Sequence, residues 1–224
     1  MKYRIEKDSL GEVKVPSTAL WGAQTQRALD NFQISGIKFA FPFGRSFIEA
    51  LGIIKYAAAS SNAALKLLPS SKSKLIKYAA KEIIDGKYDD QFPLDIFQTG
   101  SGTSTNMNAN EVMATIASKK GKTSIHPNDD VNMSQSSNDV IPTAIHISAL
   151  LDIEKLLLPS LKSLINQIKS KELKVKGVVK TGRTHLMDAM PIDMAQELSG
   201  WAAQLGDQYK QIKLAADGLK SLPQ

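Results

Sequence analysis

The stretch that decides the fold is residues 132 to 172, NMSQSSNDVIPTAIHISALLDIEKLLLPSLKSLINQIKSKE. It opens with small polar residues and becomes the longest apolar-periodic segment of the chain. Apolar residues three and four apart lie on one helical face, and a second stripe runs beside the first. The first stripe comprises Leu150, Ile153, Leu157, Leu161, Leu164 and Ile168, and the second Ile147, Leu151, Leu158 and Ile165. We expect a helix with so wide an apolar surface to lie inside a bundle, with other helices on most sides.

The ends and the prolines of this helix are predictable as well. Asn138 or Asp139 can cap its amino end, and Pro142 fits a first turn, where the missing N–H is not needed. Pro159 is expected to kink the helix without ending it. At about 1.5 Å per residue, some thirty residues extend on the order of 45 Å. We therefore expect this helix to form the centre of an elongated bundle between subunits.

Composition limits the class of protein. The chain has 224 residues, of which 42% are hydrophobic and 22% charged, enough for a sizeable core. No apolar run reaches the roughly 20 residues of a membrane span, and the amino end has no signal-peptide core. The sequence has no cysteine, which excludes disulfides and thiolate metal sites and fits a cytoplasmic protein.

The net charge of +6 does not indicate a nucleic-acid partner. The lysines are scattered and mixed with acidic residues, apart from Lys119, Lys120 and Lys122, and no aromatic residues alternate with basic ones. We expect neither a nucleic-acid nor a membrane partner.

The rest of the chain predicts a mainly α fold. Residues 1–20 suggest a hairpin or an extended arm, and helical periodicity recurs over residues 21–28, 46–68, 70–84, 106–117 and 195–222. Polar breaks interrupt it at residues 92–111, 121–132 and 175–194. Strands and helices do not alternate, so we predict no parallel sheet.

Two segments, one in the first break and one at the start of the long helix, carry hydroxyl and amide side chains. Gly100–Asn106 combines glycines with serine and threonine on the way into a helix whose amino end favours an anion. The alternative is a plain flexible loop, and a phosphate-binding P-loop is excluded because no Gly-Lys-Ser/Thr follows. Ser136–Asn138 repeats the chemistry, with ordinary helix capping as its alternative.

The three histidines differ in their surroundings. His185 follows Gly182-Arg183-Thr184, beside a cation and a hydroxyl, and can exchange a proton near neutral pH. His146 lies on the long helix among isoleucines, which is typical of a core histidine. His126 lies in a turn, where a structural role and a ligand contact are equally reasonable. The spacing of the three predicts no metal site, and we expect a site that binds small carboxylates without a metal or other cofactor.

Three long motifs resemble the fumarase/aspartase superfamily, and most closely class II fumarate hydratase. They are QTGSGTSTNMNANEV from residue 98, HPNDDVNMSQSSNDVIPTAIH from residue 126 and KTGRTHLMDAMPIDMAQELSGW from residue 180. The amino-terminal WGAQTQRAL fits too, so the resemblance covers the whole chain. QTGSGT, SSN and GRTH favour fumarase over aspartase.

The resemblance implies a small mixed amino-terminal lyase domain over residues 1–135 and a central helical-bundle domain from residue 136 to residue 224. It also implies a homotetramer that hydrates fumarate reversibly to (S)-malate in the tricarboxylic acid cycle. His185 would be the general acid. The substrate dicarboxylate would be bound by Ser101, Gly102, Thr103, Ser136, Ser137, Asn138 and Thr184. A second, peripheral dicarboxylate site would comprise His126, Pro127, Asn128 and Asp129, although Thr123 stands where many relatives have a basic residue.

One departure from the family pattern is large. The loop Gly-Ser-Ser-x-Met-Pro-x-Lys-x-Asn, whose serine is implied to be the catalytic base, does not occur in this sequence. We therefore expect an amino-terminal portion of the enzyme that is inactive by itself. The alternatives are an aspartate ammonia-lyase and a catalytically dead helical assembly fragment.

Overall fold

The structure is a computed structural model that describes residues 2–38 and 40–224, and it confirms the mainly α fold. Its elements are β1 (Tyr3–Asp8), β2 (Gly11–Pro16), α1 (Ala23–Asn31), α2 (Ala40–Ala64), α3 (Ser70–Ile84), the 3-10 helix η1 (Asp89–Gln91), α4 (Thr103–Gly121), the π-helical turn η2 (Pro127–Val131), α5 (Ser137–Asp152), the π-helical turn η3 (Ile153–Leu157), α6 (Leu158–Lys174), β3 (Val179–Thr184), β4 (Met187–Asp193) and α7 (Met194–Gly218). Among the described residues, no helix is both long enough and apolar enough to cross a membrane.

The chain forms two compact units. The first runs to Ser148 and includes Leu222–Gln224, and the second is Ala149–Ser221. Within the first unit, the backbone N–H of Gln224 donates to Thr143 Oγ1 at 3.0 Å, so the last residues are tied to α5. The division into domains 1–135 and 136–224 stays a prediction.

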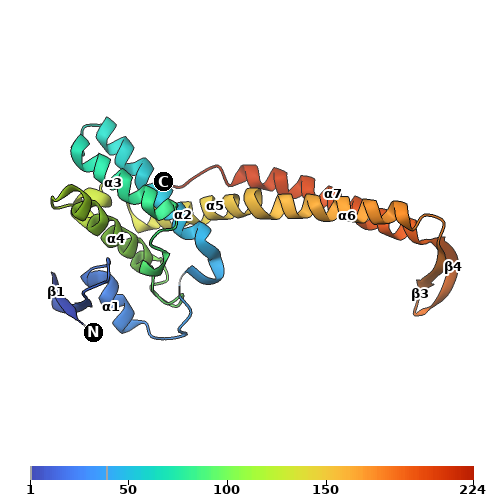
Figure 1. Cartoon of the computed structure of the whole chain (residues 1–224), viewed down its shortest axis with the longest axis horizontal. Helices are drawn as coiled ribbons and strands as arrows, with labels where there is room; N and C mark the ends of the chain where they lie inside the picture. The colour runs from blue at the N-terminus through green and yellow to red at the C-terminus, as the bar shows by residue number, and fades with distance from the viewer. Residues whose placement is uncertain (1, 39) are drawn as a thin grey trace. The chain divides into compact units, whose positions relative to one another are not determined.

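The core of the first unit lies where α2, α3 and α4 pack together (Figure 1). The side chains at its centre are fully or almost fully buried: Ile48 and Leu51 of α2, Ile76 and Ile83 of α3, and Val112 and Met113 of α4. The helix predicted over residues 70–84 is confirmed as α3, and the one predicted over residues 46–68 is present as α2 with the bounds Ala40–Ala64. β1 and β2 pair antiparallel, which confirms the predicted amino-terminal hairpin.

A buried carboxylate ties α1 to α4. The amino end of α1 has no side-chain cap of its own. Glu111 of α4 supplies one instead, accepting hydrogen bonds from the backbone N–H groups of Gly22, Gln24 and Thr25 at 2.8 to 3.1 Å and from the Thr25 hydroxyl at 2.6 Å. Glu111 is only 6% exposed, so α4 reaches across to satisfy donors that would otherwise be buried and unpaired.

The long helix is confirmed from Ser137 to Lys174, because α5, η3 and α6 follow one another without a gap. Pro159 lies just after the π-helical turn and does not end the helix, as predicted. The placement of Pro142 was wrong: helix α5 begins at Ser137, so Pro142 lies in its interior rather than its first turn.

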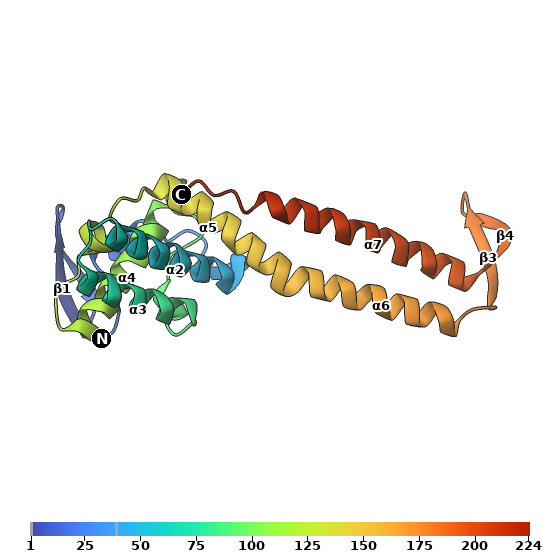
Figure 2. The ribbon, with the colours of Figure 1, turned by 90° about the horizontal axis from the view of Figure 1, so that it is seen from above.

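The second unit contains an antiparallel pair of helices, α6 and α7, which lie side by side in both views (Figures 1 and 2). Within the described chain only α7 packs along α6, so the bundle with helices on most sides of the long helix stays a prediction for the assembled protein. α6 has no fully buried residue, and Leu157 and Leu164 are 45% and 48% exposed. α7 covers α6 only in part: Leu161, Ile165 and Ile168, which come from both stripes, are half-buried.

A second hairpin connects α6 to α7, where the sequence had predicted only a polar break. β3 and β4 pair antiparallel from Val179↔Asp193 to Thr184↔Met187, with an irregularity between Thr181 and Arg183. Gly182 lies at that irregularity, and a Cβ there would come within 2.6 Å of the Met190 carbonyl oxygen. Gly182 and Pro191 interrupt the alternation of apolar and polar residues that is typical of a strand. For this reason the periodicity of the sequence did not predict the hairpin.

Candidate active site

The first predicted segment lies at the amino end of α4. Gly102 precedes the helix with φ +69°, and a Cβ on it would come within 2.9 Å of Ile141 of α5. Two features therefore favour glycine at residue 102: the left-handed backbone and the close approach of the Ile141 side chain. The hydroxyls of Ser101 and Thr103 lie 2.8 Å apart, and Ser101 is exposed. The N–H groups of Ser104 and Thr105 already donate to Thr99 Oγ1 and Gln98 Oε1. The segment therefore offers an anion two hydroxyls and the favourable amino end of the helix dipole.

The second segment, Ser136–Asn138, lies at the start of α5. We predicted Asn138 or Asp139 as the cap, and this is wrong: the Ser136 hydroxyl accepts a hydrogen bond from the Asn138 N–H at 3.2 Å, and the Ser136 carbonyl accepts from Val140. Ser136 reaches the first free donors, whereas Asn138 already lies inside the helix. Asn138 is exposed and its side chain is not needed as a cap.

A buried asparagine joins the two segments. Asn106 of α4 is 1% exposed, and its Nδ2 donates to Ser137 Oγ at 3.1 Å and to Asn132 Oδ1 at 3.2 Å. The amide thus bridges the helix that follows the first segment and the turn that leads into the second. The structure therefore places the two polar segments at adjacent helix starts, which sequence spacing could not show.

Lys55 of α2 lies beneath the same turn. It is 0% exposed, and its Nζ donates to Asn132 Oδ1 at 2.9 Å and to Gln135 Oε1 at 3.0 Å. Both acceptors are neutral amides, and burial lowers the pKa of Lys55 to about 7. We did not predict this residue, although the sequence contained a signal: Lys55 continues the apolar stripe of Ile48 and Leu51 at helical spacing.

We expect Lys55 to make stability depend on pH. Its pKa is about 7 in the folded chain and near 10.5 when unfolded, so between these values the unfolded chain binds the additional proton. Folding stability should therefore rise with pH across this window, by up to about 1.4 kcal/mol per pH unit. Urea unfolding from pH 6.5 to 10 should show the rise in the unmodified chain and in the control K74M, which alters an exposed lysine of α3. An equally steep rise in K55M would contradict this assignment.

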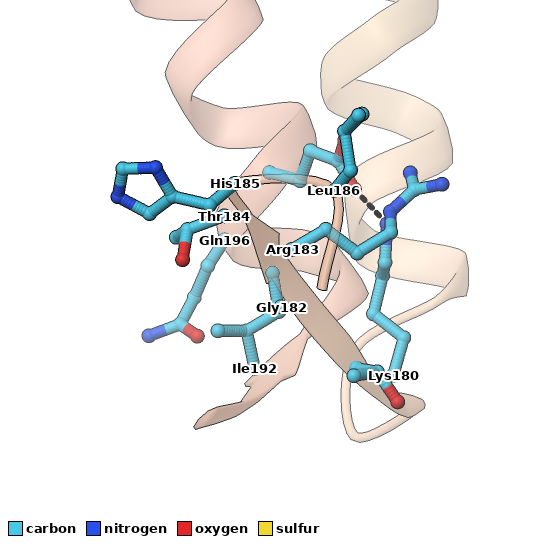
Figure 3. Close-up of a pocket in the computed structure, with 10 residues that line it drawn as sticks. Lys180, Gly182, Arg183, Thr184, His185, Leu186, Ile192 and Gln196 are labelled. Carbon is cyan, nitrogen blue, oxygen red and sulfur yellow. Dashed lines mark hydrogen bonds and ion pairs between the residues drawn. The ribbon is translucent and has the colours of Figure 1, made fainter. Parts of the chain in front are cut away.

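Thr184 and His185 lie in the second unit, on the β3–β4 hairpin. His185 and Leu186 form its two-residue loop with φ +50° and +61°, a conformation that normally requires glycine or asparagine. Two such residues cost roughly 1–2 kcal/mol each. Figure 3 shows the His185 imidazole pointing outward from the hairpin. The strained loop thus presents the histidine to solvent.

The hairpin and the start of α7 line a hollow of about 820 Å³. Arg183, Lys180 and Glu197 line it together with Thr184 and His185. Lys180 is hydrogen-bonded to Glu197, and this bond lowers the pKa of the Glu197 carboxyl. Glu197 therefore offsets one cation and leaves Arg183 as an excess positive charge, which favours an anionic ligand.

The residues predicted for a peripheral dicarboxylate site lie in the first unit, at η2. His126 is exposed, and its Nδ1 accepts a hydrogen bond from the Asp129 N–H at 3.1 Å. Asp130 anchors the turn by accepting from the His126 N–H at 2.8 Å and from Lys72 Nζ at 2.7 Å. These hydrogen bonds hold the turn together, and Asn128 and Asp129 are exposed on it.

A cavity of about 580 Å³ adjoins this turn, with His126, Pro127 and Asn128 on its wall. Its other charged lining side chains are Glu6, Lys7, Asp8, Glu111 and Lys119. Since acids outnumber lysines here and Thr123 adds no charge, the wall of this cavity carries no excess of positive charge. In the described part of the chain, no group of three or more His, Asp or Glu side chains is arranged to bind a metal ion.

The substrate-site residues therefore divide between the units. Ser101, Gly102, Thr103 and Ser136–Asn138 belong to the first unit, and Thr184 and His185 to the second. The roles of all of them stay predictions.

Comparison with known proteins supports the resemblance. A family model described as "Lyase" matches residues 11–224. A class II fumarate hydratase of Xylella fastidiosa is 55% identical over 99% of this chain, and one of Mycobacterium tuberculosis is 53% identical over 98%. The chain spans 46% and 45% of the length of these two relatives, so it corresponds to about half of each.

A solved structure agrees. Recombinant class II fumarase from Schistosoma mansoni superposes with a TM-score of 0.93 at 40% identity, covering 99% of this chain and 47% of that one. A structure of a fumarate lyase:delta crystallin from Brucella melitensis superposes with the same TM-score and identity. The superposition covers 99% of this chain and 52% of that one. The chain therefore belongs to this lyase family, and its resemblance to class II fumarate hydratases is confirmed over nearly its whole length.

Proposed function

We propose that the protein to which this chain belongs hydrates fumarate reversibly to malate. The observation that carries the proposal is the Asn106 bridge, which holds two segments of neutral hydroxyl and amide donors at adjacent helix starts. Removing a proton beside a carboxylate leaves an intermediate whose charge spreads onto that carboxylate. Fixed neutral donors stabilise such charge as it develops, without reorganising during the reaction.

The other step is the departure of the hydroxyl group, and here we assign the proton donor to His185. Its exposed imidazole on a constrained loop, beside the excess charge of Arg183, supports this role. Thr184 would help to bind a carboxylate. The base is not among the residues we assign, because the serine loop that the resemblance implies does not occur in this sequence. We accordingly expect this chain alone to be inactive.

We also propose that the active protein is a homotetramer and that the domains divide near residue 135. The exposed apolar side chains of η3, α6 and α7, such as Leu157, Leu164 and Trp201, support association through the second unit. We place the protein in the cytoplasm and expect no nucleic-acid partner, on the composition alone.

The test is a chimera in which this chain replaces the matching part of the Xylella fastidiosa relative. The same preparation is assayed for malate dehydration and for aspartate deamination. We expect malate turnover and no ammonia release, since the site residues are neutral donors, whereas an ammonium group needs acceptors or a buried negative charge. A larger kcat/KM on aspartate would favour the ammonia-lyase alternative, and a folded tetramer without either activity would favour the dead assembly fragment.

A further inference from the structure

Lys55 is an unusual side chain to find at the base of this site. The core around it is apolar, with Leu51 and Ile54 beside it on α2 fully or nearly buried. A buried ammonium normally pairs with a carboxylate, because desolvating an unpaired charge is costly. The two acceptors of Lys55 are the amide oxygens of Asn132 and Gln135, which carry no net charge. Its positive charge is therefore not neutralised by its hydrogen-bond partners.

The same two partners shape the turn before α5. Gln135 Nε2 donates to the carbonyls of Val131 and Met133 at 2.9 and 3.2 Å, and Asn132 Nδ2 donates to the Gln135 carbonyl at 3.1 Å. Lys55 Nζ fixes the oxygen ends of both amides and so determines how they are oriented. Displacing it would leave Gln135 Oε1 without its donor and Asn132 Oδ1 with Asn106 as its remaining donor.

This network leads directly to the proposed substrate donors. Asn132 Oδ1 accepts from Lys55 and from Asn106, and Asn106 also donates to Ser137. Ser136, Ser137 and Asn138 follow the turn without an intervening residue. One buried cation is thus connected, through two amides, to the segment that would bind a carboxylate.

We propose that Lys55 is a positioning residue of the dicarboxylate site, which holds the turn of residues 132–135 in shape and whose positive charge favours binding of the dianion at Ser136–Asn138. The inference rests on the proposed function, since it assumes that this segment binds a dicarboxylate. Lys55 does not touch the substrate in this assignment and takes no part in proton transfer.

A purely structural role of Lys55 would not require its positive charge. A neutral amine keeps two N–H donors, enough for both amide oxygens, so the hydrogen bonds can persist when the proton is lost. The attraction between Lys55 and an anion, by contrast, requires the protonated, charged amine. Substrate binding should therefore weaken as the pH rises past about 7, the pKa of Lys55, because an anion must then bind together with a proton.

Other charged groups around Lys55 do not account for this behaviour. Burial is the only cause of its lowered pKa. The charged side chains of the neighbouring elements are paired elsewhere or exposed: Lys72 of α3 with Asp130 of η2, Glu111 of α4 with the start of α1, Asp89 of η1 with Arg45, and Asp139 of α5 in solvent. His126, which precedes η2, is exposed as well.

The experiment uses the chimera with the Xylella fastidiosa relative and compares the unmodified protein with K55M and K74M. Malate dehydration is measured from pH 6 to 9. At pH 6.5 we expect K55M to raise KM roughly 10-fold, as for a charge acting at about 10 Å through a protein interior, and to change kcat by less than about threefold. The rise of KM above pH 7 should be lost in K55M and kept in K74M, which removes an exposed lysine.

Two outcomes would overturn the proposal and leave the proposed function standing: an active K55M with an unchanged KM, or one whose KM still rises with pH as in the unmodified protein. An unmodified chimera without malate turnover would instead refute the proposed function, and the role of Lys55 with it.

If K55M does not fold, the unmodified protein and H185N are titrated with succinate, a dicarboxylate that cannot be hydrated, at pH 8 in two buffers of different ionisation enthalpy. Proton uptake on binding in both proteins supports the proposal, because His185 cannot then be the acceptor. Absence of uptake in H185N overturns it.

Discussion

His185→Asn should lower the kcat for malate dehydration in the chimera by roughly 10²- to 10⁴-fold, the usual contribution of a general acid. Asparagine is close in size to histidine and tolerates a left-handed backbone, so the two-residue loop with His185 at φ +50° should persist. KM should change little, because our assignment gives substrate binding to the hydroxyl and amide side chains. The loss should therefore appear in the chemical step.

The matched control is His126→Asn, the same substitution on the exposed η2 turn. We expect its kcat to stay nearly intact, because the peripheral site has no part in the reaction. Initial rates over a range of malate concentrations separate the two parameters. Equal damage from both substitutions would show that we had assigned the wrong histidine.

Glu111→Gln should destabilise the chain by roughly 2–4 kcal/mol, the cost of unpairing buried donors and losing charge-assisted hydrogen bonds. The carboxylate accepts from three backbone N–H groups and from the Thr25 hydroxyl. An amide retains one acceptor oxygen and turns an NH₂ group towards donors. The amino end of α1 would thus lose its cap.

Urea unfolding at pH 7 gives the change in the free energy of unfolding. The control is Glu12→Gln on β2, which makes the same chemical change at an exposed carboxylate and should stay within about 0.5 kcal/mol of the unmodified chain. If E111Q unfolds at the same urea concentration as this control, Glu111 does not carry the link between α1 and α4.

Local patterns in the sequence were sufficient to predict the helices and to identify the family. The apolar spacing of residues 46–68 and 70–84 predicted α2 and α3, and the long periodic segment predicted the helix from Ser137 to Lys174. Helical periodicity reports which side chains share a face, and that is a property of neighbouring residues. The three long motifs identified the lyase family by the same kind of local information.

Only the tertiary structure decided what surrounds those faces and how the site is supported. The extent to which α6 is covered depends on how many helices reach it, and within the described chain only α7 packs along it. The buried position of Lys55 depends on a turn some eighty residues away in sequence, whose amides come to lie over it. Burial and hydrogen bonding between distant segments depend on three-dimensional packing, and a one-dimensional pattern can indicate an unusual lysine without showing what it binds.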